Sequence, residues 1–393
     1  MEALKHMMRL PTSLSSLVAL ISATAPLVGA AEPTLTDDSS CGCFLTNGNE
    51  SSYFTSHRFF DFRSLSEYAG VPPTIRDVDS SAGASKTSAF FNTTGWTDFW
   101  MLGSWNNSHN VRGDATVLMV NSPNNVYIEA NNEPNPTSQT WLTLRTQRLS
   151  RFQSAAELES TSAEYKHLSL RMRARTVGAR GAITAMFTYR GGDTLADVQE
   201  SDLEIRTSDP RNLVHYTNQP AYTDAGEVIT DATRNVTLPG GKDWTEWATH
   251  RMDWTPGKTT WYVDDVLVAQ IVFQAPRDES NIILNAWSDG GGWTGNMSVS
   301  DAAYLQVQWV EVVYNNTAEE TAEGRGAGRD GEGLCENVCS IDETPELGRP
   351  VLLWGGANAG NAENTENAAG RLVAWGPIGL MGVVGLLSAG LLG

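Results

Sequence analysis

Short alternating runs of apolar and polar residues dominate the chain between residues 115 and 314, and turn-forming residues separate them. Such runs, rich in β-branched and aromatic side chains and without a 3.6-residue period, indicate strands. We predict strands at 115–120, 126–130, 140–147, 156–160, 166–176, 182–189, 200–205, 247–254, 259–263, 266–273, 281–286 and 304–314, with a long loop between the seventh and the eighth. The fold class that follows is all-β, a sandwich of two antiparallel sheets.

One tight turn is predicted at residue level. Asp264 and Asp265 lie between two β-rich runs, where the central residues of a two-residue hairpin loop are expected.

Three acidic residues share one side of the strand predicted at 200–205. Glu200, Asp202 and Glu204 project to one face because side chains alternate along a strand. Like charges this close cost stability unless they have a use. Glycoside hydrolysis uses such a set, because one carboxyl group attacks or stabilises the sugar carbon and another protonates the leaving oxygen.

The spacing of the two glutamates permits a retaining mechanism without requiring it. Their Cα atoms are about 13 Å apart on an ideal strand, at ~3.3 Å per residue. Retaining enzymes hold the two carboxyl groups about 5–5.5 Å apart. Long glutamate side chains that lean inward on a concave sheet would close this gap.

Composition narrows the class of partner. The 393 residues include 13 Trp and 36 Gly, only 19% are charged, and the net charge is −19. Abundant Trp and Gly with few charges suit a sandwich with a sugar-binding surface. The acidity argues against nucleic acid as a partner, because no basic patch is present to neutralise phosphates.

Both ends of the chain have the pattern of targeting segments. Residues 1–30 carry Lys5 and Arg9, an apolar run and small residues before position 31, which predicts a cleaved signal peptide; the alternative is a hydrophobic helix that is retained. Small residues at 358–360, a polar spacer and an uncharged tail predict a glycosylphosphatidylinositol (GPI) signal at 361–393, with attachment at Asn358 and with Asn364 and residues 367–369 as alternative positions. The alternative for the tail is a permanent transmembrane helix. Between these ends we expect a sandwich domain at 31–318 and a flexible, cysteine-bearing tail at 319–360.

Secretion accounts for two further patterns. Glycosylation sequons are present at Asn49, Asn92, Asn106, Asn235, Asn296 and Asn315. A disulfide between Cys41 and Cys43 would close a strained small loop, so each is expected to pair with Cys335 or Cys339, with the connectivity left open. Four thiolates on zinc are the alternative.

The chain resembles glycoside hydrolase family 16, the concanavalin A-like β-jelly-roll glucanases, most closely its surface-anchored fungal members. The residues that carry the likeness are Glu200-Ser201-Asp202-Leu203-Glu204 as the E-x-D-x-E motif, a preceding strand that ends in Phe187-Thr188-Tyr189, the run Trp254-Thr255-Pro256-Gly257 with the hairpin at 261–265, Asn285-Ala286-Trp287, and a last strand at 307–314. The likeness is good over residues 140–315 and loose over 50–140.

The resemblance implies roles for single residues. Glu200 would be the nucleophile, Glu204 the general acid/base, and Asp202 the residue that sets the position and charge of Glu200. Phe187, Tyr189, Tyr216, Asn285 and Trp287 would line the cleft, to which we add Trp293 and His215 from the sequence. For each aromatic residue the alternative is a place in the core. Two positions depart from the family: Ser201 replaces a usually apolar residue, and Glu159 is found where an Arg or Gly is common.

The function expected is a retaining endo-β-glucanase at the cell surface, monomeric, with β-1,3 or mixed β-1,3/1,4-glucan as substrate and no cofactor. A wall transglycosylase of the same fold is one alternative, and a non-catalytic, lectin-like glucan-binding protein is another. No set of residues in the sequence places a calcium ion.

Overall fold

The computed structural model describes residues 34–108, 112–318 and 335–355. The predicted leader, the anchor signal and Asn358 lie outside the described residues. Within the described ranges, no helix has the length and apolar character needed to cross a membrane.

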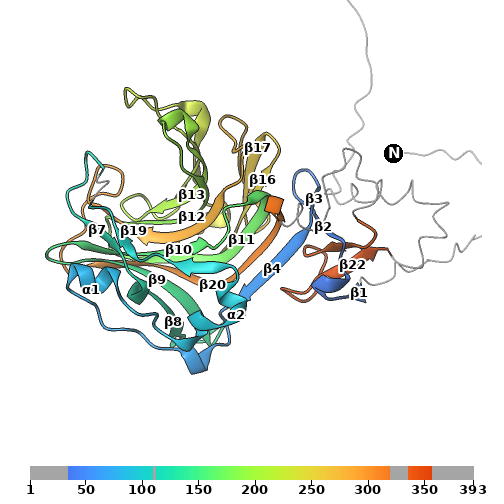
Figure 1. Ribbon diagram of the computed structural model, residues 1–393, viewed down its shortest axis with the longest axis horizontal. Coiled ribbons are helices and arrows are strands. Elements are labelled where there is room, and N and C mark those ends of the chain that lie inside the picture. The colour runs from blue at the N-terminus through green and yellow to red at the C-terminus, as the bar shows by residue number, and fades with distance from the viewer. Residues whose placement is uncertain (1–33, 109–111, 319–334, 356–393) are drawn as a thin grey trace, which may run out of the picture. The chain divides into compact units, whose positions relative to one another are not determined.

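Two antiparallel sheets form a jelly-roll-like sandwich (Figure 1). The first, here called the carboxylate sheet, has the strand order β15 (Thr233–Thr237), β14 (Leu213–Gln219), β13 (Gln199–Arg206), β12 (Ile183–Arg190), β19 (Asn281–Trp287), β10 (Gln153–Ser160) and β5 (Trp100–Leu102). Its central strand pairs show no register shift, so residues on neighbouring strands form straight rows.

The second sheet, here called the backing sheet, is centred on the two longest strands. Its members are β18 (Val266–Ile271), β17 (Lys258–Val263), β16 (Ala248–Thr255), β11 (Tyr165–Gly178), β20 (Ala302–Asn316), β4 (Ser56–Asp61), β9 (Thr140–Arg148), β8 (Val126–Ala130), β7 (Met119–Asn121) and β6 (Trp105–Asn106). Strand β10 joins the two sheets, since its first residues pair with β7 and β9 and its last residues pair with β19 and β5. Helices α1 (Val78–Ala82) and α2 (Thr94–Thr97) are short.

The core lies between the sheets and follows from the alternation of side chains. Leu203 and Ile205 of β13 meet residues such as Trp254 and Trp261 in one continuous buried cluster. Large aromatic residues each bury roughly 150–250 Å² and so supply much of the packing energy. The predicted hairpin turn is confirmed: Asp264 and Asp265 have φ values of 45° and 64° between the paired residues Val263 and Val266.

The predicted long loop between β13 and β16 is wrong in part, because it contains β14 and β15. Strand β14 extends the carboxylate sheet directly beside β13, with Glu204 opposite His215. The outward-facing residues of β14 are mostly polar. The segment therefore contains no apolar run that would predict a strand.

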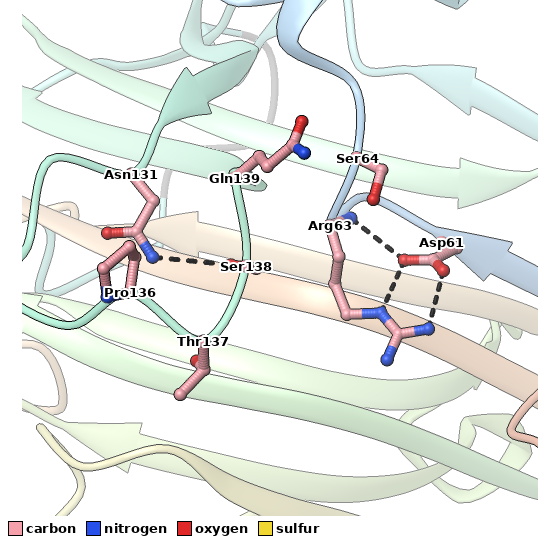
Figure 2. A pocket seen from close by; sticks show the side chains of 8 residues that line it. All are labelled: Asp61, Arg63, Ser64, Asn131, Pro136, Thr137, Ser138 and Gln139. Carbon is pink, nitrogen blue, oxygen red and sulfur yellow. Dashed lines mark hydrogen bonds and ion pairs between the residues drawn. The ribbon is translucent and has the colours of Figure 1, made fainter.

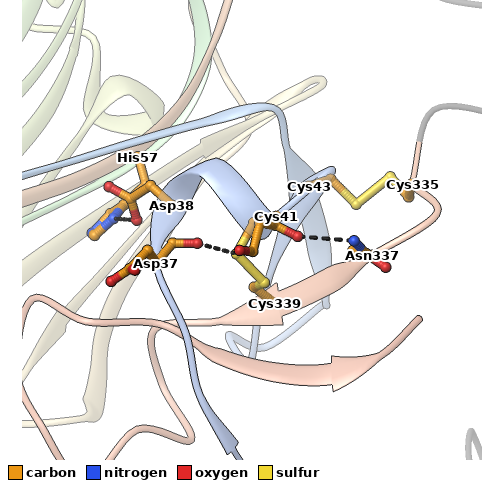
Figure 3. The surroundings of a disulfide bond; sticks show 9 residues. Asp37, Asp38, Cys41, Cys43, His57, Cys335, Asn337 and Cys339 are labelled. Carbon is orange, nitrogen blue, oxygen red and sulfur yellow. Dashed lines mark hydrogen bonds and ion pairs between the residues drawn. A yellow bond between two sulfur atoms is a disulfide. The ribbon is translucent and has the colours of Figure 1, made fainter. Parts of the chain in front are cut away.

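A five-stranded terminal sheet brings the two ends of the described chain together. Its strand order is β1 (Thr34–Leu35), β22 (Val351–Trp354), β21 (Val338–Ser340), β2 (Cys43–Thr46) and β3 (Ser52–Phe54). Disulfides join Cys41 to Cys339 and Cys43 to Cys335 (Figure 3), as expected for the pairing of early with late cysteines. The predicted flexible tail at 319–360 is wrong for residues 335–355, which include β21 and β22.

Paired charges bind the terminal sheet to the backing sheet. Arg171 Nη1 lies 2.5 Å from Asp342 Oδ1, and Arg251 Nη1 lies 3.8 Å from the same oxygen. His57 lies 2.7 Å from Asp38 and 3.2 Å from Glu311. Burial alone would lower the pKa of His57, but the two carboxylates outweigh it and raise that pKa to about 9.

Candidate active site

Strand β13 places the three predicted acidic residues on one face, turned away from the core. Glu200 and Glu204 are partly exposed and Asp202 is 2% exposed, whereas the alternating residues Leu203 and Ile205 are buried in the core. The strand is regular and pairs with β12 and β14 on either side. The predicted extended segment with a single acidic face is therefore present.

Glu200 and Asp202 act as a pair. Burial raises the pKa of Glu200, and a hydrogen bond joins the two carboxyl groups. This bond opposes the rise for Glu200 and adds to it for Asp202, so Asp202 carries the proton and donates it. Burial first, and then repulsion by Glu200 and Glu204, holds the pKa of Asp202 well above its usual range. Gln219 Nε2 donates to Asp202 Oδ2 at 3.4 Å. A protonated Asp202 favours the ionised form of Glu200 and fixes its position.

Glu204 has a different environment. Burial, followed by repulsion from Glu200, raises its pKa to about 7. The indole Nε1 of Trp293 donates to Glu204 Oε1 at 3.3 Å and limits the rise, as do the nearby charges of Arg206 and Arg112. A carboxyl group with this pKa is available in both protonation states near neutral pH, as general acid–base catalysis requires.

A supporting layer fixes Trp293. The guanidinium of Arg206 lies 4.3 Å from the centre of the Trp293 ring. The His215 ring lies 5.2 Å from Trp293, and its two nitrogens contact Asp209 at 2.6 Å and Asn235 at 2.7 Å. His215 is therefore placed to support the indole that contacts Glu204.

The other predicted substrate-binding residues, with one exception, lie on the same face. Phe187 and Tyr189 are opposite Asp202 and Glu200 on β12. Asn285 and Trp287 occupy the corresponding side of β19, and Arg112 lies 5.8 Å from the Trp287 ring. These side chains form a continuous polar and aromatic surface around the three carboxyl groups.

The exception is Tyr216, whose prediction as a cleft residue is wrong. It is 1% exposed, packs against Trp261 at 5.5 Å and belongs to the core. Tyr216 is opposite Leu203, which faces inward, whereas its neighbour His215 is opposite Glu204. Adjacent residues of a strand point to opposite faces, so both could not line one surface.

Ser201, the polar departure on the inner face, has partners of its own. Its hydroxyl donates to Asn218 Oδ1 at 2.7 Å and lies 2.9 Å from Thr259 Oγ1. Asn218 in turn donates to the backbone oxygens of Ile271 and Phe273. The buried hydroxyl is satisfied, and this network links the catalytic strand to the backing sheet.

The structure adds two acidic residues to the same face, of which sequence analysis flagged only the second. Glu157 is opposite Asn285, and Glu159 is opposite Ile283, on strand β10. Trp105 Nε1 donates to Glu157 Oε1 at 2.8 Å, and Asn281 Nδ2 donates to Glu159 Oε1 at 2.8 Å. The signal in the sequence was the spacing of 157 and 159, which repeats that of 200, 202 and 204.

Two pockets lie apart from the carboxyl groups of β13. One, of about 580 Å³, is lined by Asp61, Arg63, Ser64 and residues 131 and 136–139, and Asp61 and Arg63 form an ion pair on one side of it (Figure 2). The other, of about 650 Å³, lies beside β5 and includes Met101 and Lys86. Among the described residues no group of three or more His, Cys, Asp or Glu side chains is arranged to hold a metal ion.

All six sequon asparagines fall in the described part of the chain, and none is buried. Asn49, Asn92, Asn235 and Asn296 are exposed, and Asn106 and Asn315 are partly exposed. Each is therefore accessible at least in part.

Comparison with family models gives one match in the region of the site. The model "Glycosyl hydrolases family 16" matches residues 114–311, which is half of the chain and includes β13 with its three carboxyl groups.

The chain is also similar in part to curated relatives and to solved structures. A β-glucanase of Paenibacillus polymyxa is 27% identical over 139 residues, covering 34% of this chain and 54% of the relative, and one of Paenibacillus macerans is 27% identical over 142 residues with the same coverage. The chain thus spans about half the length of these curated relatives. Among solved structures, a β-1,3-1,4-glucanase (lichenase) derived from a mouse hindgut metagenome has a TM-score of 0.44 at 17% identity, over 66% of this chain and 99% of that one. A Bacillus licheniformis β-glucanase has a TM-score of 0.41 at 23% identity, over 56% and 93%.

Proposed function

The chain belongs to glycosyl hydrolase family 16, and from that premise we propose that it is a retaining endo-β-glucanase that cleaves β-1,3 or mixed β-1,3/1,4-glucan. The observation that carries the proposal is the division of protons among the three carboxyl groups of β13. Asp202 donates a hydrogen bond to Glu200, which opposes the rise that burial causes in the pKa of Glu200, whereas Glu204 lacks such a donor carboxyl group and its pKa is raised to about 7. One nucleophile and one acid on the same face are what a double-displacement mechanism needs.

In the first step of this mechanism Glu200 attacks the anomeric carbon. The bond from that carbon to the glycosidic oxygen breaks, and Glu204 gives its proton to the departing oxygen. The sugar is then held on Glu200 as an ester. Trp293, which contacts Glu204, holds the acid in place during the transfer.

In the second step Glu204, now a carboxylate, removes a proton from water. The water oxygen attacks the anomeric carbon, and the ester bond to Glu200 breaks, which restores both groups to their starting states. A sugar hydroxyl in place of water would give transglycosylation, which uses the same residues.

The test is the activity of wild type and Glu200→Gln on laminarin and lichenan. We expect wild type to release oligosaccharides with the β-anomer formed first, as seen by proton NMR, and Glu200→Gln to lose activity. Glu67→Gln, which neutralises an exposed carboxylate outside the carboxylate sheet, is the matched control. Formation of the α-anomer first would refute retention, and unchanged turnover by Glu200→Gln would refute the site.

A labelled glucan acceptor added to the same assay distinguishes hydrolysis from transfer. Label that enters longer chains would assign a transglycosylase. Binding of glucan without product from either reaction would leave a lectin-like protein, contrary to the proposal.

The proposed place of action is the cell surface. The supporting observations are the disulfides of the terminal sheet and the accessible sequon asparagines, both of which suit an oxidising, glycosylating pathway. Treatment of intact cells with a phosphatidylinositol-specific phospholipase is expected to release the protein. Retention on the treated cells would count against a GPI anchor at Asn358.

A further inference from the structure

A second acidic cluster lies on the carboxylate sheet, away from the three carboxyl groups of β13. Its members are Glu157 and Glu159, which lie on the same face of β10. Glu204, Ala185, Asn285 and Glu157 form a row across four neighbouring strands, so Glu157 lies about 14 Å from the acid/base at ~4.8 Å per strand. Neither glutamate forms an ion pair with any described residue. The pair is thus an uncompensated negative site.

An exposed aromatic ring borders this cluster. Trp105 is 41% exposed, although its Nε1 is fixed by the bond to Glu157. Gly103 allows the close approach: a Cβ there would lie 2.8 Å from Glu157 Cβ and 3.3 Å from Asn121 Cβ. An indole that is fixed through its Nε1 and exposes its ring face can stack on a sugar ring or bind a cation.

Two amide oxygens on the strands beside Glu157 lack hydrogen-bond donors. The side-chain oxygens of Asn285 and Asn121 are buried and have no hydrogen-bond partner among the described residues, and these asparagines are 9% and 2% exposed. Buried acceptors without partners are costly and indicate a ligand that supplies donors. Two amide oxygens without donors thus accompany the two glutamates.

Three cationic residues on neighbouring segments have other partners. Lys86 Nζ donates to the backbone oxygen of Phe91, and Arg190 Nη1 donates to that of Glu279. Arg112, near Trp287, is paired with Asp114 and Asp289. None of the three neutralises Glu157 or Glu159.

We propose that Glu157, Glu159, Asn121, Asn285 and Trp105 form a subsite for a hexosamine unit with a free, protonated amine. This inference rests on the proposed function, because it names the sugar class selected at the far end of the same substrate surface. An ammonium group has three donors and no acceptor, which suits two carboxyl groups and two amide oxygens that have no partner among the described residues. A neutral sugar supplies hydroxyl donors but no charge to offset two carboxylates.

The state of the carboxyl groups without ligand agrees with this assignment. Burial, with added repulsion from Glu159, raises the pKa of Glu157 to about 7 although Trp105 donates to it. Burial also raises the pKa of Glu159. A bound cation stabilises the ionised form of a carboxyl group, and this effect is largest where burial has disfavoured ionisation. The net charge of −19 also attracts a cationic polysaccharide from a distance.

The test compares three oligosaccharides with one β-1,4-linked backbone and a different group at C2: the amine, the acetamide or the hydroxyl. Calorimetry on the full chain carrying Glu204→Gln prevents turnover. At pH 7 we expect the amine form to bind about tenfold more tightly than the hydroxyl form, and Glu157→Gln with Glu159→Gln to remove most of that difference. Glu67→Gln removes one charge elsewhere and should leave the preference intact.

Equal affinity for the amine and hydroxyl forms would overturn the inference, as would a preference that survives the double substitution. A preference that Glu67→Gln reduces as much as the double substitution would reveal attraction by overall charge only, which also overturns it. Absence of binding for all three forms overturns the subsite, but glucan cleavage by wild type would then still uphold the proposed function. Loss of cleavage alone would refute the function and leave the binding preference measurable.

Discussion

Two groups of buried carboxylates face outward from opposite sheets of this sandwich, and they have opposite surroundings. On the backing sheet, Asp253 accepts two bonds of 2.8 Å from Arg251, and Asp342 lies against Arg171 and Arg251. On the carboxylate sheet, Glu200 and Asp202 have each other as partners. Cations lower the pKa of Asp342, whereas burial raises the pKa of all three acidic residues on β13.

This contrast distinguishes carboxyl groups that stabilise the fold from carboxyl groups that can exchange protons. A carboxylate beside arginine is locked in one protonation state and contributes to cohesion. A carboxyl group without a cation costs stability, and its pKa moves into the range where it exchanges protons at physiological pH. The backing sheet therefore uses its charges to hold the terminal sheet, and the carboxylate sheet keeps its charges available for reaction.

The largest effect is expected from Glu204→Gln. Loss of the general acid should lower kcat on glucan by about 10²–10⁴-fold. The free energy of unfolding at pH 8 should change little, because the substitution removes a carboxylate whose ionised form is disfavoured by burial and by Glu200 in spite of the nearby Arg206 and Arg112. Release of reducing sugars measures kcat, and urea unfolding measures the free energy of unfolding. A large loss of stability at pH 8 would show that Glu204 stabilises the fold and would contradict the prediction.

The counterpart on the other sheet is Asp342→Ala. It leaves Arg171 buried without its partner, so the free energy of unfolding should fall by about 3 kcal/mol. The value of kcat should stay within about twofold of wild type, because the pair lies on the opposite sheet from Glu204. Urea unfolding without reductant and the same activity assay test this, with exposed Glu343→Gln as the control.

Stability and activity should depend on pH over different ranges. The change in the free energy of unfolding that is due to His57 should be roughly 2 kcal/mol or less. The pKa of His57 is about 9 when folded, against an ordinary 6.5, so its stabilising effect is complete below about pH 6.5 and is lost as the pH rises through 9. Activity should fall earlier, as the pH rises through about 7 and Glu204 loses its proton. His57→Gln should flatten the fall in stability between pH 7 and 9 and leave the activity profile in place; a matching shift of both curves would contradict this.

The smallest predicted effect concerns Trp293→Phe. The indole donor lowers the pKa of Glu204, so its removal should move the alkaline limb of activity to higher pH, by less than about one unit. Trp105→Phe, which removes an indole donor to Glu157 instead, should leave that limb unchanged. A pH profile of kcat/KM measures both variants.

The strands and the acidic face were predictable because both depend on alternation within one segment. Glu200, Asp202 and Glu204 have to share a face on any extended chain. Tyr216 was misplaced because strand β14 was not predicted, and without it nothing showed that His215 and Tyr216 point in opposite directions. The resemblance to a family indicated a cleft tyrosine at this position, but it did not show to which face of the strand the side chain points.

Contacts distant in sequence account for the rest. The partners of Ser201 lie 17 and 58 residues away, and β2 pairs with β21 nearly 300 residues later. The terminal strands have only two to four residues each, too few to show a period, and disulfides and buried ion pairs hold them in place. Patterns within a local window do not detect structure held in this way.

The disulfides of the terminal sheet also determine how this protein would behave when cut. Each encloses most of the chain, from Cys41 to Cys339 and from Cys43 to Cys335. A protease that cleaves one peptide bond between residues 44 and 334 would therefore release no fragment, and the nicked molecule would migrate as one species on a gel until a thiol reductant is added. Damage to a surface loop need not separate Glu200 from the sheet that supports it.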